Sequence, residues 1–337
     1  MDPGTAALPA ERERPASPGV FISWAKLRRA DTIAERLGMP SLAIKRGRRG
    51  GPAVFTLFRY AVQSVETLLA LAWRRPRVVF VTSPPVFAAF PVYLYALVFR
   101  ARYVVDCHSG CFLDAHWRRW DRWQRFFARR AVLNIAHNAE NAAVLESWKV
   151  PVTVLPSLPP DLNGAGSSGP LEPKRRPLAV YVCSFKDDEP VEALLDAVRA
   201  LPEIDVAVSG RAPPRIAKLL PPNARLTGFL PDEDYNRLLG TADLVIALTT
   251  RPGTLLYGAQ EAIALAKPLV LSRTPTLEAY FPEGTVFAAN EPEALARGIR
   301  DALARGEELR AAMVRFRERY LEEGAARLSD IRKRVGL

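Results

Sequence analysis

The strongest constraint on the fold is an alternation of strands and helices that runs along the chain twice. In the first half, short apolar runs such as residues 77–82 (RVVFVT) alternate with helical segments across short polar links. Strands and helices that alternate in this way form a parallel sheet with helices on both faces. The expected strands are 19–24, 41–44, 77–82, 103–106, 131–136 and 152–155, and the expected helices are 30–37, 54–73 and 87–99.

The alternation stops at residues 156–177, which are rich in Pro, Gly and Ser and have no apolar periodicity, and then restarts. We therefore predict two Rossmann-like, doubly wound α/β domains that face each other across a cleft, where such sheets bind ligands. The predicted parts are a disordered tail (1–17), an N-terminal domain (18–160), a linker (161–177), a C-terminal domain (178–305) and closing helices (306–337). In the second half, the expected strands are 178–183, 205–209, 225–229, 243–248, 268–271 and 285–288. The expected helices there are 191–201, 232–239, 258–265, 291–305 and 307–328.

Composition excludes several classes of protein. The 337 residues are 49% apolar and 25% charged, which is typical of a globular chain and not of a disordered or fibrous one. The three cysteines, Cys107, Cys111 and Cys183, are too few for a disulfide framework and wrongly spaced for a zinc site, so we expect a reducing compartment. The first 17 residues lack the apolar core of a secretion signal. The apolar run 86–99 has 14 residues, and a spanning helix needs about 20.

The net charge of +11 is confined to one half of the chain. Residues 1–160 contain 23 basic and 11 acidic residues, whereas residues 161–337 contain 24 and 25. Such asymmetry favours a polyanion or an anionic membrane surface as partner of the first half. A general bias toward arginine, which outnumbers lysine 39 to 8, is the alternative explanation.

Residues 117–130 (WRRWDRWQRFFARR) place aromatic residues at helical spacing among six arginines. Basic residues beside interfacial aromatics suit a helix that lies on anionic lipid headgroups, and the same composition suits stacking on single-stranded nucleic acid. An ordinary amphipathic helix with a buried stripe is a third interpretation. We expect membrane or acceptor contact through this segment, together with residues 45–51 as a second basic cluster and the apolar helix expected within residues 86–99. The contact residues expected in it are Trp117, Arg118, Trp120, Arg122 and Arg125.

The loops after the predicted strands exclude three nucleotide or hydrolase motifs. Neither predicted first strand is followed by a G-x-G-x-x-G turn, and the chain has no P-loop and no G-x-S-x-G elbow. Residues 249–261 (TTRPGTLLYGAQE) instead follow a strand and open a helix. The N–H groups at such a helix N-terminus suit a diphosphate, and Glu261, one turn in, could accept both hydroxyls of a ribose. A capped helix with a solvated glutamate is the alternative.

The order of motifs in the second half resembles the donor domain of two-domain glycosyltransferases with the GT-B fold, in particular the retaining enzymes of family 4. Their signature is E-x7-E followed by A-x-G-K-P-V-V. Glu261 matches the second glutamate, and residues 262–270 (AIALAKPLV) match the run after it. Residues 225–231 (RLTGFLP) resemble the loop whose backbone contacts the base. Two departures stand out: Gly253 occupies the place of the first glutamate, and 183–186 (CSFK) replaces the Gly-Arg…Lys pair.

The resemblance implies a nucleoside-diphosphate sugar as donor and no metal or other cofactor, because basic groups and helix N-termini neutralise the leaving diphosphate. It also implies retention of anomeric configuration. In the first half, His108 with Asp106 follows a strand where the family often has a histidine, and we take both as catalytic. His137, Asn138 and His116 are weaker candidates, and Arg251 is an alternative phosphate ligand. The donor-binding residues implied are Ser184, Lys186, Gly210, Arg211, Gly228, Phe229, Thr254, Leu255, Leu256, Tyr257, Gly258 and Glu261.

These features together predict a hexosyltransferase that lies peripherally on the inner face of the cell membrane. It would transfer sugar to a lipid-linked saccharide in envelope or exopolysaccharide synthesis, with no nucleic-acid partner. The alternatives are a nucleotide-sugar epimerase of the same fold and an inactive, glycosyltransferase-like binding protein, which Gly253 would favour.

Overall fold

The computed structural model describes residues 18–47, 53–162, 164, 169 and 176–337. The predicted tail (1–17), part of the basic cluster 45–51 and most of the predicted linker lie outside these residues. Contacts divide the described chain into two compact units. One holds the residues up to Asn134 with Trp148–Pro151 and Arg332–Leu337, and the other holds Ile135–Ser147 and Val152–Ile331.

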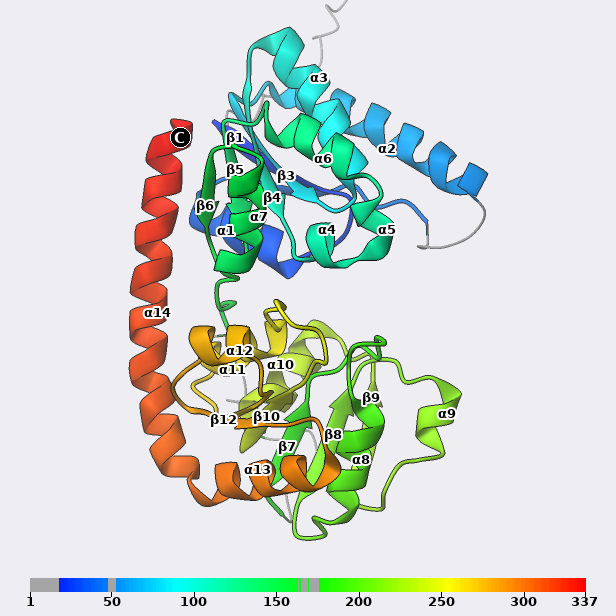
Figure 1. Cartoon of the computed structure of the whole chain (residues 1–337), viewed down its shortest axis with the longest axis vertical. Coiled ribbons are helices and arrows are strands. Elements are labelled where there is room, and N and C mark those ends of the chain that lie inside the picture. The colour runs from blue at the N-terminus through cyan, green and yellow to red at the C-terminus, as the bar shows by residue number, and fades with distance from the viewer. Residues whose placement is uncertain (1–17, 48–52, 163, 165–168, 170–175) are drawn as a thin grey trace, which may run out of the picture. The chain divides into compact units, whose positions relative to one another are not determined.

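The first sheet has six strands in the order β2-β1-β3-β4-β5-β6 (Figure 1). The pairs β1–β2, β1–β3 and β3–β4 run parallel. Every residue of β1 and of β3 is buried, as expected when helices cover both faces of a parallel sheet. The strands are β1 (Gly19–Ser23), β2 (Ser41–Ala43), β3 (Val78–Ser83), β4 (Arg102–Cys107), β5 (Leu133–Ala136) and β6 (Val152–Val154).

The second sheet also has six strands, in the order β12-β11-β10-β7-β8-β9, and all its pairs run parallel. Successive residues of β7 alternate between two hydrophobic clusters. Ala179 and Tyr181 pack in one cluster, and Leu178 and Val180 in the other. The sheet is therefore covered on both faces. Its strands are β7 (Leu178–Tyr181), β8 (Asp205–Ser209), β9 (Ala224–Gly228), β10 (Leu244–Ala247), β11 (Leu269–Ser272) and β12 (Thr285–Ala288).

The fold class predicted from the alternation is confirmed: two parallel sheets, each flanked by helices. The α-helices associated with the first sheet are α1 (Arg28–Arg36), α2 (Ala53–Arg74), α3 (Ala89–Phe99), α4 (Gly110–Leu113), α5 (Ala115–Arg118), α6 (Asp121–Ala128) and α7 (Ala139–Ser147). Those that follow are α8 (Val191–Arg199), α9 (Pro214–Ala217), α10 (Asp232–Thr241), α11 (Tyr257–Ala264), α12 (Pro275–Tyr280), α13 (Pro292–Ala304) and α14 (Gly306–Val335).

All twelve predicted strands are present, with ends that differ from the prediction by no more than two residues. The helices were predicted less completely. Helix α7 was missed because it has no single apolar face, since Asn141 is buried on it beside Ala142 and Leu145. The predicted helix 307–328 is longer than expected, because α14 continues to Val335. Its last turn belongs to the first unit, where Arg332 donates to the carbonyl of Leu37.

Candidate functional site

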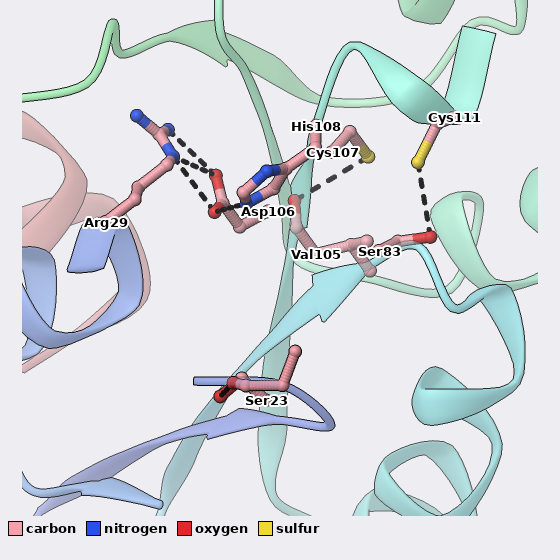
Figure 2. A network of polar contacts seen from close by, with 9 residues as sticks. Ser23, Arg29, Ser83, Val105, Asp106, Cys107, His108 and Cys111 are labelled. Atoms are coloured by element: carbon pink, nitrogen blue, oxygen red, sulfur yellow. Dashed lines mark hydrogen bonds and ion pairs between the residues drawn. The ribbon is translucent and has the colours of Figure 1, made fainter. Parts of the chain in front are cut away.

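A buried ion pair stands at the carboxyl end of β4. Arg29, on α1, donates from Nε to Oδ2 of Asp106 at 3.1 Å and from Nη2 to Oδ1 at 2.8 Å (Figure 2). The two side chains are 3% and 0% exposed. A carboxylate taken out of water is stable only when it is paired and hydrogen bonded, and the guanidinium provides both. Sequence reasoning missed Arg29, which has no sequence signal distinguishing it from its basic neighbours.

His108 lies beside this pair. Its Nε2 is 3.2 Å from Oδ2 of Asp106, and its backbone N–H donates to the carbonyl of Ser83 at 2.8 Å. His108 keeps 23% of its side chain exposed, whereas Asp106 is fully enclosed. Of the two predicted catalytic residues, only the imidazole has solvent access. Arg29 contacts both oxygens of Asp106, and Oδ2 also faces the imidazole, so the geometry suits Asp106 to orient the His108 ring.

The cysteines near His108 are structural. Cys107 and Cys111 are buried, and the Cys111 thiol donates to the Ser83 hydroxyl at 3.3 Å (Figure 2). Hydrogen bonding to Cys111, together with burial, raises the pKa of the Cys107 thiol well above its usual value. Because the thiolate is the reactive form of cysteine, Cys107 is kept inert.

The weaker histidine candidates differ in their surroundings. His137 and Asn138 are buried just after β5. His116 is exposed on α5 and meets the ring of Trp117 edge-on, with centroids 4.7 Å apart. Its backbone N–H donates to Asp114, which caps that short helix.

The predicted aromatic and basic segment is two short helices, α5 and α6, and its apolar stripe is mostly turned inward. Gln124 and Phe127 are buried, and Trp120 packs edge-on against Phe87 at 4.9 Å. The residues expected to meet a membrane or acceptor divide by exposure. Trp117 and Trp120 are half-buried, and Arg118, Arg122 and Arg125 are exposed. Arg125 is also paired with Asp121 at 2.6 Å.

In the second sheet, the loop after β7 is organised around Glu189. Its carboxylate accepts the backbone N–H of Ser184 at 3.0 Å, the Ser184 hydroxyl at 3.0 Å and the backbone N–H of Lys186 at 2.7 Å. The backbone N–H groups of two expected donor-binding residues, Ser184 and Lys186, therefore already donate to the carboxylate of Glu189. The Lys186 side chain remains exposed. Burial and the nearby Glu189 charge raise the pKa of Cys183, the residue before this loop, to about 12.

The ends of β8 and β9 bring predicted glycines close to this loop. Gly210 has φ +93°, and a Cβ there would lie 2.3 Å from the Cys183 carbonyl oxygen. Its backbone N–H donates to the carbonyl of Gly228, which also has positive φ. Glycine is required at Gly210 on both counts, conformation and space. The neighbouring Arg211 and Phe229 are exposed.

The loop after β10 leads into α11 as the sequence predicted. Helix α11 begins at Tyr257, and no side chain caps its N-terminus. Within its first turn, the Cα of Gly258 approaches Val182, the residue after β7, so closely that an added Cβ would lie 2.9 Å from the Cβ of Val182. The preceding residues Thr254, Leu255 and Leu256 are half-buried. An uncapped helix N-terminus at the carboxyl edge of a parallel sheet suits an anion.

Gly253 has φ +67°, a conformation that residues with a side chain rarely adopt. The backbone itself therefore favours glycine where the family pattern has its first glutamate. Glu261, at the place of the second glutamate, is 2% exposed. Its Oε2 accepts a hydrogen bond from the Tyr235 hydroxyl at 2.8 Å. Tyr235, on α10, is a residue that sequence reasoning missed.

Two further polar groups have structural roles. The ammonium of Lys267, in the run that matches the family signature, donates to the carbonyls of Gly240 and Ala242 at 2.6 and 2.8 Å. Asp188 accepts a hydrogen bond from the Thr249 hydroxyl at 3.0 Å and lies 3.7 Å from Arg251. Arg251, the alternative phosphate ligand, is thus held on the β10–α11 loop next to a carboxylate.

Residues 186–328 match the model of a glycosyl transferase-like family. No curated protein matches the chain by sequence. Among solved structures, it is similar to sucrose-phosphate synthase of Thermosynechococcus elongatus, with TM-score 0.73 and 13% identity over 95% of this chain and 99% of that one. It is also similar to the Anabaena protein HepE in complex with UDP, with TM-score 0.66 and 14% identity over 95% and 98% of the two chains.

A third similar structure is a Listeria monocytogenes protein described as a UDP-N-acetylglucosamine 2-epimerase, with TM-score 0.58 and 12% identity over 89% and 91% of the two chains. At these identities, the likenesses establish the fold. Residues 186–328 therefore form a glycosyl transferase-like segment, and the chain as a whole has the two-domain α/β fold called GT-B.

Proposed function

We propose that the chain is a glycosyltransferase that takes a hexose from a nucleoside-diphosphate sugar. The observation that carries the proposal is the β10–α11 region: an uncapped helix N-terminus followed one turn later by the buried carboxylate of Glu261. It lies inside the segment that matches the glycosyl transferase-like family. HepE, which is similar in fold, is solved with UDP and with UDP-glucose, and this supports a uridine diphosphate sugar as the first donor to test.

In this proposal, the α11 N-terminus holds the diphosphate, and its fixed N–H groups stabilise the charge that develops as the diphosphate leaves. Lys186, Arg211 and Arg251 add positive charge, so no metal is required. Glu261 accepts the ribose hydroxyls and Tyr235 fixes the orientation of its carboxylate. His108, held by Asp106, hydrogen bonds the transferred sugar. The family resemblance supports retention of anomeric configuration.

For the acceptor, we propose a lipid-linked saccharide at the inner face of the cell membrane, in envelope or exopolysaccharide synthesis. The support is the excess of positive charge in residues 1–160, because the half that contains the glycosyl transferase-like segment is nearly neutral. Donor diphosphate therefore does not account for the excess. A lipid diphosphate and an anionic leaflet would both be attracted by it.

The test is a thermal-shift screen of nucleoside-diphosphate sugars with the full chain and Glu261→Gln. A ligand at 100 times its Kd stabilises the chain by about 2.7 kcal/mol, which gives a measurable shift. We expect one donor class to shift the wild type and to lose at least about tenfold in affinity with Glu261→Gln. Glu293→Gln, an exposed glutamate in the first turn of α13, is the matched control. No shift with any donor would refute the proposal.

The Listeria likeness keeps the nucleotide-sugar epimerase as a second candidate. The two enzymes differ in their products. Incubation with donor and no membrane fraction would release an epimerised sugar from an epimerase, whereas a transferase would need the acceptor before it releases nucleoside diphosphate. Donor binding with no turnover in either assay would point to the inactive binding protein.

A further inference from the structure

The long helix α2 is inverted with respect to an ordinary surface helix. Its buried side chains include Gln63 and Thr67, which are polar. Gln63 donates to the carbonyl of Ile44, and the Thr67 hydroxyl accepts from the indole of Trp24 at 3.1 Å. Leu71 continues the same buried row. A helix in water normally buries its apolar residues and exposes its polar ones, whereas α2 buries Gln63 and Thr67 and leaves many of its apolar residues exposed.

The exposed face of α2 is almost entirely apolar. Large side chains that are between 51% and 76% exposed recur along it at helical spacing: Val54, Phe55, Leu57, Phe58, Val65, Leu69 and Trp73. Helix α3 packs against α2 (Figure 1). It ends in the same way, with Leu97 and Val98 more than 60% exposed. This many exposed large apolar side chains on one helix and the end of its neighbour mark an interaction site.

The charge around this surface favours a lipid partner. Residues 45–77 contain eight basic residues and a single acid, Glu66. Arg46 is paired with that acid, with its Nε 3.0 Å from the carboxylate. The part of the chain that carries the apolar face of α2 therefore has a net positive charge, which complements anionic headgroups. A second copy of this chain would bring the same charges together and be repelled.

We propose that the exposed face of α2, with the end of α3, inserts into the interface of an anionic membrane, with the helix lying in the membrane plane. Residues 54–74 are long and apolar enough to cross a bilayer by length and composition. Spanning would, however, detach Gln63 and Thr67 from the partners they hold in the folded domain and place them with Glu66 in hydrocarbon. The surface is different from the aromatic segment 117–130 expected from sequence.

The test is co-sedimentation of the full chain with phosphatidylcholine vesicles that contain 0% or about 30% phosphatidylglycerol. We expect binding to the anionic vesicles that weakens with salt. Phe55→Ser/Phe58→Ser should reduce it by at least about tenfold, because two large apolar side chains that would be buried in the membrane are lost. Leu219→Ser, an exposed leucine outside the first unit, is the matched control. Circular dichroism checks that each variant is folded.

The other outcomes overturn the proposal. Unchanged vesicle binding by the double variant would show that another surface contacts the membrane. Loss of vesicle binding with Trp120→Ser instead would show that this surface is the aromatic segment. A wild-type dimer that the double variant dissociates would make the face a contact between copies. Resistance to sodium carbonate extraction would indicate a spanning helix. No sugar donor is present in these assays, so their result is independent of the proposed transferase activity.

Discussion

Replacing Arg29 with methionine tests the buried pair that supports His108. The substitution keeps most of the side-chain volume and removes the guanidinium that holds Asp106 through contacts of 2.8 to 3.2 Å. Asp106 is 0% exposed, so no water can replace the lost donors without opening the domain. Removing one partner of a buried pair costs about 3–5 kcal/mol. That is a large part of the 5–15 kcal/mol of stability of a typical domain.

The assay is urea unfolding followed by circular dichroism, with each transition fitted separately because the chain has two units. Arg36→Met is the matched control, since Arg36 is exposed on the same helix and should change stability by less than about 0.5 kcal/mol. The variant Arg29→Met/Asp106→Leu replaces both charges by apolar groups and should be more stable than Arg29→Met alone. A cost below about 1 kcal/mol for Arg29→Met, or equal stability of the single and double variants, would refute the reasoning.

Other predictions concern the second unit. Gly210→Ala should cost several kcal/mol, because φ is +93° and the new Cβ would meet the Cys183 carbonyl at 2.3 Å, whereas Gly306→Ala, with open space around it, should cost nothing measurable by thermal unfolding. Glu189→Ala should cost about 1–3 kcal/mol by freeing the N–H groups of the β7–α8 loop, as measured by urea unfolding, and unchanged stability would contradict this. Tyr235→Phe should weaken donor binding by about tenfold and lower the unfolding free energy by about 1–3 kcal/mol, because the buried Glu261 carboxylate loses a hydrogen-bond donor. Cys183 has its pKa raised from 9 to about 12, so the folded state keeps its proton longer than the unfolded chain. Stability should therefore fall as the pH rises from about 9 to about 12, and less steeply in Cys183→Ala.

The strands were predictable because most of them are short apolar runs between turn residues. The run 77–82 is recognisable without any partner, and β3 covers 78–83. Glu261 was placed on a helix after a strand by its motif alone, and the structure puts it on α11. The local sequence pattern was therefore enough to predict the strands, several helices and the elements that carry the donor residues. It could not supply the tertiary contacts that decide what each polar group does.

Arg29 illustrates that limit. Asp106 lies 77 residues away in sequence, and nothing local distinguishes Arg29 from Lys26 or Arg28. Arg29 differs from these neighbours in being buried in the folded domain. The triplet 187–189 (DDE) is a similar case. It reads as three equivalent acids, yet Asp187 is exposed, Asp188 accepts a hydrogen bond from Thr249, and Glu189 occupies the loop that was expected to hold a phosphate.

Helix α2 shows how a correct local prediction can leave the function of an element open. Its sequence is apolar on most faces, which fits a buried core helix and a helix at a lipid surface equally well. The decisive residues are the few polar ones. If Gln63 and Thr67 faced water, the apolar stripe would be part of the core. Because both side chains are buried and hydrogen bonded within the domain, the apolar stripe of α2 is exposed on the surface of the domain. Part of the positive charge of the first half lies in the same stretch of sequence, residues 45–77, as this apolar face, which water solvates poorly.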